Sequence, residues 1–328
     1  MSKIEESGVL IVLGNGHNLA MGLRTSYSAF ASHYLIDNNS NENSQLKKYL
    51  TSSYAKHPNN WSDMEGEIKY FALHNSPSSL NIEIEHKYFI ELIQDMGFYM
   101  DGEAKYQFLC NHIDNNPDFI ESLPVFLFKT IFNQDRHYKV ISLNYTDLDL
   151  PMDCLARDIV FPFNEQSKLS DIEITRRIHE YTRARFDVRY VHLSGTKCIL
   201  GIDDDTRIHK CMNFLKKAYQ FEKTPYNNVN LKDYCAALFY GYSFGETDSD
   251  FVRALFDEVL QKSIFENPKL YFVTRDDVGK EAILNNLTFH LNSPLSTIQK
   301  HIRYDFIIDD GKDNSSSRSA LLLALMRT

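Results

Sequence analysis

The amino-terminal part of the chain contains an unbroken apolar run, Gly8 to Leu13 (GVLIVL), which is followed directly by Gly14-Asn15-Gly16. A continuous apolar run of this length is typical of a β-strand that is buried on both faces. Such strands lie at the centre of parallel α/β sheets, and open α/β sheets bind ligands at the loops that follow their strands. The run therefore predicts an α/β fold with a candidate ligand-binding loop directly after its first strand.

The first loop has two glycines that can serve a ligand. Gly14 and Gly16 carry no side chain, so a phosphate or a ribose can approach the backbone N–H groups of this loop. The common dinucleotide fingerprint has a third glycine three residues after the second, whereas this chain has Leu19 there and its next glycine at Gly22. A tight turn from strand to helix that binds nothing is the alternative.

Other apolar runs predict the remaining strands of the sheet. These runs are Tyr138 to Leu143, Val188 to Leu193, Cys235 to Tyr240, Leu270 to Thr274 and a last strand within YDFIIDD at 304–310. Polar loops follow four of the strands, at Gly14 to Asn18, Asn144 to Asp147, Ser194 to Thr196 and Ser243 to Asp248. Right-handed crossovers gather the carboxyl ends of parallel strands at one edge. The four loops are therefore expected to form one nucleotide-sized site.

Much of the remaining chain has helical spacing. Apolar residues predict a helix after Thr25 or Ser26, either of which can act as its cap. From 82 to about 134 the pattern is helical, and Pro124 should start a new helix or kink one. We interpret residues 38–136, approximately, as a helical insertion that covers the site loop.

Further helices are expected in the second half of the chain. Residues 150–185 predict a loop and one helix, 198–202 a short strand, and 208–219 another helix. Helices are also predicted over 251–259, after a cap at Thr247 or Asp248, over 278–287, and at the carboxyl end. At 328 residues we expect a single α/β domain with this insertion and a short extension at about 300–328.

Two acidic stretches have competing interpretations. The only tryptophan, Trp61, stands beside three carboxylates; the simplest interpretation is a helix start capped by Ser62 or Asp63, and a catalytic role for the acids is the alternative. The run Asp203-Asp204-Asp205 is most simply a solvated loop. A divalent cation is the alternative there, but the glycine and the downstream glutamate of a calcium loop are missing.

Composition excludes several classes of function. The net charge of -9, without a compensating basic tract, argues against a sequence-independent nucleic-acid surface. The five cysteines are scattered and form no Cys-x-x-Cys pair, which indicates reduced thiols in a cytoplasmic protein. The first residues are polar, so we expect no signal peptide. The apolar run LLLALM at 321–326 is too short to span a membrane.

Four motifs together resemble a known family. The stretch Gly14 to Phe30 resembles the opening signature of the bacterial AbiH abortive-infection proteins, and Trp61 to Glu65 resembles their Trp-x-Asp-x-Glu element. Leu143 to Thr146 resembles their third motif and Gly241 to Asp248 their last, so the motifs stand in order over residues 8–250. The resemblance implies a Rossmann-like, mostly parallel sheet with sirtuin-like topology, a nucleotide-binding fold whose defence members cleave NAD.

The resemblance also implies roles for individual residues. Asn144 would orient the ribose or an attacking water, and cleavage of the nicotinamide–ribose bond would pass through an oxocarbenium-like transition state. NAD would be the substrate or ligand, with no further cofactor and no metal. The residues expected to bind the nucleotide are Gly14, Asn15, Gly16, Asn18, Arg24, Thr25, Ser26, Tyr27, Asp147, Gly195, Gly241, Ser243 and Asp248.

One departure from the family concerns the catalytic base. The family usually has a histidine directly before the glycine of its third-strand loop, whereas Ser194 precedes Gly195 here and the nearest histidine is His192. Residues two apart in an extended strand face the same side, and an imidazole titrates near neutral pH. We therefore expect His192 to handle the proton, with Ser194 beside it. A packed histidine without a catalytic role is the alternative.

Two classes of function follow. The first is an anti-phage effector that hydrolyses NAD and depletes it in abortive infection. The second is a catalytically weak or inactive nucleotide-binding sensor, or a partner subunit of a defence complex. Neither class requires a membrane or direct contact with nucleic acid, and a homo-oligomer fits both.

Overall fold

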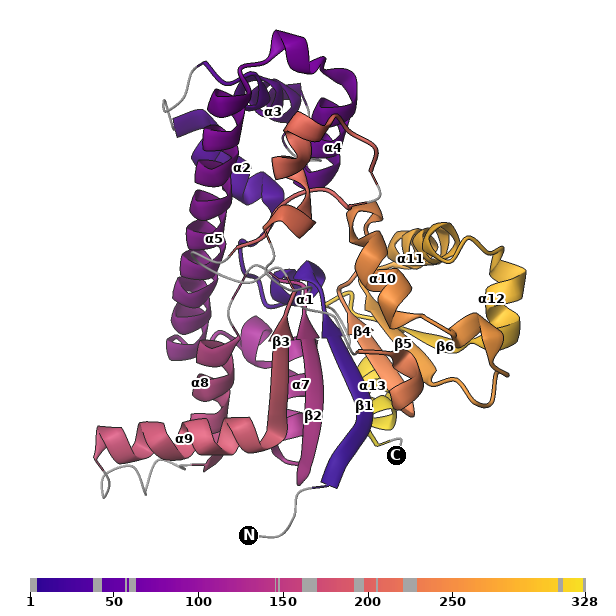
Figure 1. Ribbon diagram of the computed structural model, residues 1–328. Helices are drawn as coiled ribbons and strands as arrows, with labels where there is room; N and C mark the ends of the chain where they lie inside the picture. The colour runs from indigo at the N-terminus through magenta and orange to yellow at the C-terminus, as the bar shows by residue number, and fades with distance from the viewer. Residues whose placement is uncertain are drawn as a thin grey trace.

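A six-stranded parallel sheet forms the centre of the protein (Figure 1). The computed structural model describes residues 5–37, 43–56, 58, 63–144, 146, 148–160, 170–191, 198–204, 206–220, 229–311 and 315–326. The strands are β1 (Glu5–Leu13), β2 (Arg136–Ser142), β3 (Phe186–Tyr190), β4 (Ala236–Tyr240), β5 (Lys269–Thr274) and β6 (Arg303–Ile308). Their order is β3-β2-β1-β4-β5-β6, and all neighbouring pairs are parallel. This confirms the predicted Rossmann-like α/β class.

The central strand β1 explains why its sequence is apolar throughout. Residues 9–13 are at most 1% exposed. Val9, Ile11 and Leu13 belong to the hydrophobic core on one face of the sheet, while Leu10 and Val12 belong to the core on the other face. Since side chains alternate along a strand, a strand covered on both faces must be apolar at every position.

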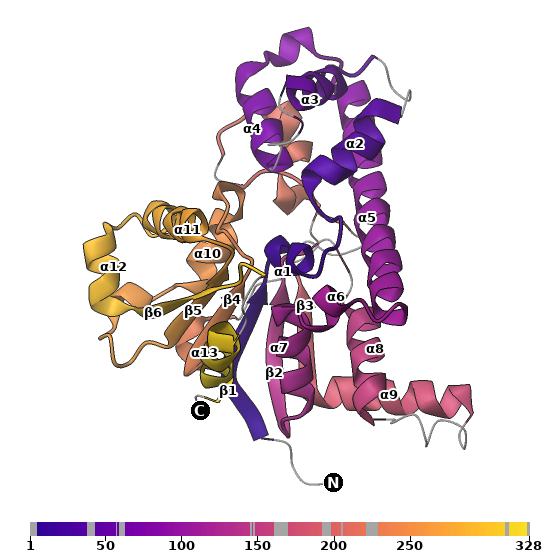
Figure 2. The same cartoon turned by 180° about the vertical axis from the view of Figure 1, so that it is seen from behind.

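Helices cover both faces of the sheet. The first face carries α7 (Leu123–Phe132), α8 (Asp149–Val160), α9 (Asp171–Arg185) and α13 (Ser315–Leu325), and Figure 2 shows α7 and α13 in front of the strands. The second face carries α10 (Ser249–Leu255), α11 (Asp277–His290) and α12 (Leu295–His301). The carboxyl-terminal residues thus supply an edge strand, β6, and the helix α13, which packs in the hydrophobic core on the first face of the sheet.

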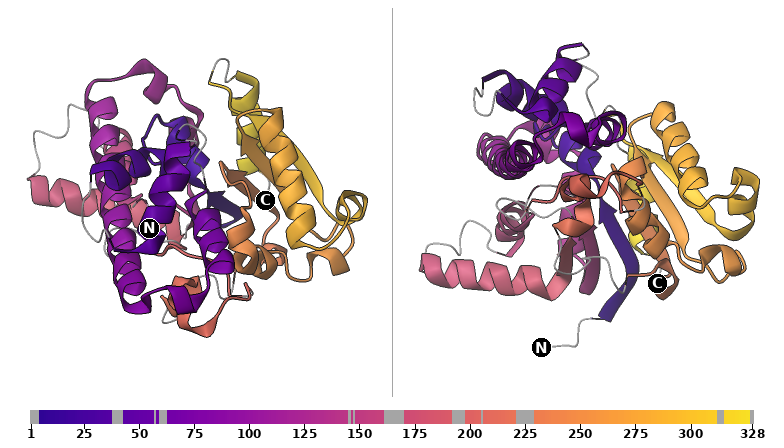
Figure 3. Two further views of the ribbon diagram at one scale, coloured as in Figure 1. Left: turned by 90° about the horizontal axis from the view of Figure 1, so that it is seen from above. Right: turned by 45° about the horizontal axis from the view of Figure 1, so that its top comes forward.

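A separate group of helices stands above the carboxyl edge of the sheet (Figure 1). It comprises α2 (Tyr27–Asp37), α3 (Gln45–Lys56), α4 (Met64–His74) and the first half of α5 (Ile82–Ile113). Residues between Cys198 and Leu215 complete its hydrophobic core, which is distinct from the two cores of the sheet. We call this group the helical body. Seen from above, it is set apart from the orange and yellow carboxyl-terminal part of the chain (Figure 3).

Short helices and turns complete the described chain. They are α1 (Asn15–Ala20), α6 (Pro117–Ile120), η2 (Pro77–Ser79), η5 (Lys210–Leu215), η6 (Lys217–Tyr219), η7 (Leu231–Asp233), η8 (Glu246–Asp248) and η9 (Val259–Gln261). Two predicted helix starts are confirmed: Asp63 accepts a hydrogen bond from the Gly66 N–H at the start of α4, and Pro124 lies in the first turn of α7. None of the helices built from described residues is long and apolar enough to cross a membrane.

Several predicted elements are wrong in kind or extent. The described residues between 150 and 185 belong to two helices, α8 and α9, and Ser170 starts the second by accepting a hydrogen bond from the Glu173 N–H. Residues 208–219 form the 3-10 turns η5 and η6, since Lys216 is extended and pairs with Ile202. Among the described residues, that pairing is the only one found for the predicted strand 198–202. In addition, β3 ends at Tyr190 and α10 ends at Leu255.

Candidate functional site

The strand order creates a topological switch point between β1 and β4, which we call the β1–β4 crevice. Strand β1 pairs with β2 on one side and with β4 on the other, so the chain connections diverge between β1 and β4. Open α/β sheets bind ligands outside the carboxyl ends of the strands at such a point. The loops after β1 and β4 touch here: the Gly14 N–H donates to the Tyr240 carbonyl at 2.8 Å, and the Gly16 N–H donates to the Gly241 carbonyl at 2.9 Å.

The glycines of these two loops make this contact possible. A Cβ on Gly14 would lie 2.4 Å from the Gly241 carbonyl oxygen, and a Cβ on Gly16 would lie 2.7 Å from the Gly241 Cα. Gly241 itself has φ +61°, and a Cβ there would lie 2.2 Å from the His17 nitrogen. The space beside the first loop is therefore filled by backbone of the β4–α10 loop. The close contact between the two loops therefore explains why glycine is needed at these positions, whereas the sequence suggested only the approach of a ligand.

A cavity of about 470 Å³ lies at the carboxyl ends of β4, β5 and β6. Three of the predicted nucleotide-binding residues, Gly16, Gly241 and Ser243, are part of its lining. Apolar side chains from α1, β5 and α11 form much of the wall. The polar groups are concentrated at the end of β5 and in the loops that follow β5 and β6, at Thr274, Arg275, Asp309 and Asp310.

One carboxylate of the cavity is held by a buried tyrosine. The Tyr240 hydroxyl donates a hydrogen bond to Asp309. Burial raises the pKa of Asp309 above its ordinary value, and burial together with Asp309 raises the pKa of Tyr240. Because the tyrosine proton satisfies one carboxylate oxygen, Asp309 retains acceptor capacity for a ligand hydroxyl.

A cluster of buried amides lies at the ends of β1 and β2. The Asn18 side-chain amide donates to the Thr146 hydroxyl at 2.7 Å, and the Asn144 amide donates to Asn18 Oδ1 at 3.5 Å. Asn18 and Asn144 are each 1% exposed. The remaining oxygen, Asn144 Oδ1, accepts no hydrogen bond from any described residue. The predicted catalytic asparagine thus has a buried, unpartnered acceptor.

His17 connects this amide cluster with Tyr240. Its Nδ1 lies 3.4 Å from Asn18 Oδ1, and its ring packs edge-on against Tyr240 and Phe128. Burial lowers the pKa of His17 to about 4, so the imidazole is neutral at physiological pH. The sequence placed His17 in the first loop without assigning it a role, because a histidine next to a glycine pair carries no signal of burial.

The predicted residues from Arg24 to Tyr27 connect α1 with the helical body. The Asn15 side chain donates to the Thr25 carbonyl at 2.9 Å and accepts from the Thr25 hydroxyl at 2.7 Å. Ser26 accepts from the Ala29 N–H and is therefore the cap of α2, of which Tyr27 is the first residue. Arg24 is exposed, and its backbone N–H donates to Gln107 of α5.

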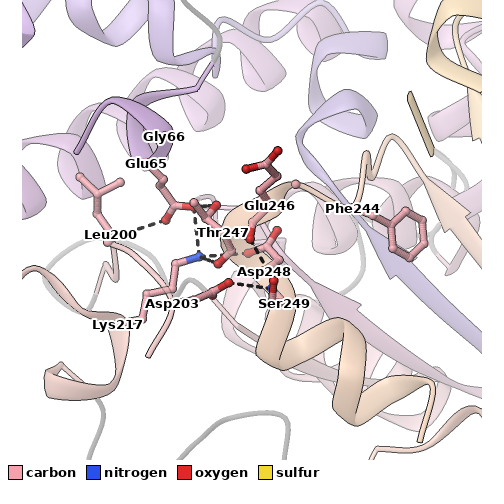
Figure 4. Close-up of polar contacts among 12 residues, drawn as sticks. Glu65, Gly66, Leu200, Asp203, Lys217, Phe244, Glu246, Thr247, Asp248 and Ser249 are labelled. Atoms are coloured by element: carbon pink, nitrogen blue, oxygen red, sulfur yellow. Dashed lines mark hydrogen bonds and ion pairs between the residues drawn. The ribbon is translucent and has the colours of Figure 1, made fainter. Parts of the chain in front are cut away.

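The last predicted binding residue, Asp248, belongs to a buried ion cluster (Figure 4). Lys217 Nζ donates to Asp248 Oδ1 and to Glu65 Oε2, both at 3.0 Å, and to the Thr247 carbonyl at 2.9 Å. The three ammonium hydrogens therefore all have acceptors. Asp248 stands at the cap position of α10, but its side chain makes no capping hydrogen bond. The sequence missed Lys217, because a single lysine in a mixed segment carries no signal.

Glu65 accepts two further hydrogen bonds in this cluster. Its Oε2 accepts from the Thr247 hydroxyl at 2.6 Å, and its Oε1 accepts from the Gly201 N–H at 3.2 Å. Burial opposes the charge of Lys217, but Asp248, Glu65 and Asp203 outweigh it and raise the pKa of the lysine. The cluster thus joins α4, the segment 201–217 and the β4–α10 loop.

Asp203 is buried, so the interpretation of its acidic run as a solvated loop is wrong for this residue, whereas Asp204 is exposed. The residue is 7% exposed, and its Oδ2 accepts from the Ser249 N–H at 3.0 Å. Burial raises the pKa of Asp203 to about 7, with a smaller contribution from Asp248 in the same direction, and Lys217 opposes the shift. The fold tolerates the burial of Asp203 because a carboxyl group with this raised pKa can stay protonated, and therefore uncharged, near neutral pH.

We expect the Asp203→Asn substitution to remove a pH dependence from the free energy of unfolding. Because the folded state raises the pKa from 3.8 to about 7, it binds the proton more tightly than the unfolded state, and stability falls as pH rises through this window. Asparagine still accepts from Ser249 but does not ionise. Urea unfolding should therefore find wild type and variant alike at about pH 4, and the variant more stable at about pH 8, by at most about 4 kcal/mol. An equal difference at both pH values would contradict the assignment.

Some predicted residues lie outside the part of the chain that the structure describes. They are Trp61, Ser62, Asp147, His192, Ser194, Gly195, Thr196 and Asp205. Within the described ranges, no group of three or more histidine, cysteine, aspartate or glutamate residues is arranged to hold a metal ion.

Comparison with known proteins gives one clear result. Neither a curated protein nor a solved structure matches this chain. A family model described as bacteriophage abortive infection AbiH matches residues 10–266, which covers well over half of the chain, both loops at the β1–β4 crevice, the amide cluster and the ion cluster. The chain therefore belongs to the AbiH family, which suggests a role in phage abortive infection.

Proposed function

We propose that this protein binds NAD at the carboxyl edge of its sheet and hydrolyses the nicotinamide–ribose bond, as a cytoplasmic effector of abortive infection. The buried Oδ1 of Asn144, which has no hydrogen-bond donor among the residues that the structure describes, carries this proposal. A buried acceptor that lacks a hydrogen bond costs about 1–3 kcal/mol. Such a cost is typical of a site where a ligand or an ordered water supplies the missing donor.

The orientation of the Asn144 amide supports this role. Its amide nitrogen donates to Asn18 Oδ1, and Asn18 is itself oriented by its short hydrogen bond to the Thr146 hydroxyl. This chain of contacts fixes which end of Asn144 remains free. A ribose hydroxyl or a water molecule that donates to this oxygen would be held in a defined position, which lowers the barrier to attack on the ribose carbon.

The cavity beside β4, β5 and β6 suits the adenosine half of the dinucleotide. Its volume, about 470 Å³, is in the usual range for small-molecule sites. The apolar wall from Leu19 and Ile283 offers a surface for a purine, and Asp309 and Asp310 offer acceptors for ribose hydroxyls. NAD would then extend from this cavity around α1 to Asn144.

The reaction consumes NAD and water and yields nicotinamide, ADP-ribose and a proton. As the nicotinamide leaves, positive charge develops on the ribose, and the Asn144 carbonyl dipole can stabilise it. We assign the proton transfer from water to His192 and a smaller catalytic contribution to Ser194. In a preparation that cleaves NAD, His192→Ala should abolish cleavage and Ser194→Ala should reduce it only modestly; full activity in His192→Ala would contradict this assignment.

The serine at the usual histidine position also supports a second function. Without a base, the same cavity and amide cluster would bind a nucleotide and report it to a partner of a defence complex. Release of nicotinamide separates the two functions, because only the effector produces it.

The experiment that tests the proposal blocks the cavity. Ala282 of α11 is in the cavity lining, so Ala282→Trp should fill the space of the adenosine half. The matched control is Ala55→Trp, on an exposed position of α3. NAD should raise the melting temperature of the wild type and of the control but not that of Ala282→Trp, and nicotinamide should be released by the first two only. Equal stabilisation of all three proteins would exclude the cavity as the site, and no effect on any of them would exclude NAD.

A further inference from the structure

The helical body and the sheet are joined by a polar contact. The helical body has its own hydrophobic core, and the sheet has the other two. Between them, Glu65 at the start of α4 faces Asp248 at the end of η8, and Lys217 lies between the two carboxylates. Figure 4 shows the lysine nitrogen in the middle of these groups. This contact is electrostatic, whereas another connection runs through α5, whose second half packs with Ala104 and Phe108 in a core of the sheet.

We call the contact among Glu65, Lys217 and Asp248 the joint. Its three charged side chains are almost completely shielded from water. The exposed fractions of the side chains are 12% for Lys217, 5% for Glu65 and 13% for Asp248. Removing one partner of a buried ion cluster leaves an uncompensated charge and is far more damaging than neutralising the whole cluster. Without the lysine, the two carboxylates would repel each other across the joint.

The joint includes Asp248 of the β4–α10 loop, which borders the cavity. Lys217 also holds the Thr247 carbonyl, and Tyr242 donates to Asp248 Oδ2 at 3.3 Å. Tyr242 follows Gly241 directly, and both residues are in the lining of the cavity. The position of the helical body is therefore coupled, over a few contacts, to the shape of the β4–α10 loop.

We propose that Lys217 is a positioning residue, which holds the helical body over the carboxyl edge of the sheet through Glu65 and shapes the nucleotide cavity through Asp248 and Thr247. The coupling to the cavity rests on the proposed function. The joint between the helical body and the sheet does not, because it is observable without any ligand.

Hydrogen exchange of the full-length protein tests the joint. In Lys217→Met, the start of α4 and residues 246–249 should exchange at least about tenfold faster than in the wild type, while β1 and β5 remain unchanged. These two segments are far apart in sequence, so a joint response reports the contact between them. Lys232→Met is the matched control, since this lysine pairs with Glu258 at the surface and should leave both segments as they are.

A charge-balanced variant separates electrostatics from packing. The triple variant Glu65→Gln, Lys217→Met, Asp248→Asn removes the repulsion between the two carboxylates and leaves only Asp203, which can take up a proton, so it should restore most of the protection that Lys217→Met loses. Equal exchange rates in the wild type and in Lys217→Met would overturn the proposal. So would faster exchange that extends over β1 and β5, or a triple variant that exchanges as fast as Lys217→Met does.

The ligand arm of the experiment tests the coupling. NAD should bind Lys217→Met about tenfold more weakly than the wild type, and Lys217→Arg, which keeps the charge, should recover most of the affinity. Unchanged affinity in Lys217→Met would limit the role of the lysine to the joint and overturn the coupling. If NAD fails to bind the wild type, the proposed function fails, and the exchange result still decides whether the joint exists.

Discussion

Replacing Gly241 by alanine is expected to lower the free energy of unfolding by several kcal/mol, enough to unfold much of the protein at room temperature. The new Cβ would lie 2.2 Å from the His17 nitrogen and 2.4 Å from the Gly16 carbonyl carbon. These are backbone atoms, so no side-chain rotation relieves the clash. The backbone at Gly241 also has φ +61°, which costs a residue with a Cβ about 1 kcal/mol in addition. Urea unfolding measures the loss.

Two other glycines are matched controls for this prediction. Gly22 has φ +74° but nothing within 4 Å of its Cβ position, so Gly22→Ala should cost only about 1 kcal/mol for the backbone conformation. Gly102 lies inside α5, also with nothing within 4 Å, and Gly102→Ala should stabilise the protein by about 0.5–1 kcal/mol. A Gly241→Ala loss no larger than that of Gly22→Ala would show that the two loops are not packed as described.

The Asn144→Ala variant is expected to lose NAD cleavage by about 100-fold or more and to retain most of its affinity for NAD. Preorganised polar groups that act in the transition state contribute on this scale. The loss should appear in kcat, because a group that orients the reacting water or ribose acts mainly in the transition state. Single-turnover kinetics, with NAD affinity measured by calorimetry, separates the two terms.

The control for Asn144→Ala is the same substitution at an exposed asparagine. Asn285 on α11 is exposed, so Asn285→Ala should change neither turnover nor affinity. Thr146→Val is a second variant of the same chain of contacts: it removes the hydroxyl that orients Asn18 and should reduce turnover by less than Asn144→Ala does. Wild-type turnover in Asn144→Ala would assign this residue to the turn alone.

The amino-acid sequence determined the strands of the sheet because burial leaves a local pattern. Strands such as β1 and β4 are covered on both faces, so every position in them must be apolar. Helix starts are equally local: Asp63, Ser26 and Pro124 act within one turn of their own position. The all-parallel arrangement then places the loops after the strands at a single edge.

The same local information misplaced the elements that depend on distant partners. Residues 208–219 have the apolar spacing of a helix, yet pairing between Ile202 and Lys216 extends the backbone and divides the segment into turns. Asp203 lies in an acidic run typical of a solvated loop, yet it is buried, where it accepts a hydrogen bond from Ser249 and is attracted by the charge of Lys217.

The tertiary structure alone decided which of the loop residues work together. It assigned Gly241 and Ser243 to the cavity, Asn18 and Asn144 to the amide cluster, and Asp248 to the joint with Lys217. The hydrogen bond between Thr247 and Glu65 spans 182 residues, and no periodicity in a sequence encodes a partner at such a distance. A sequence pattern indicates how deeply a residue is buried, whereas the packing of the folded chain determines which residues lie next to it.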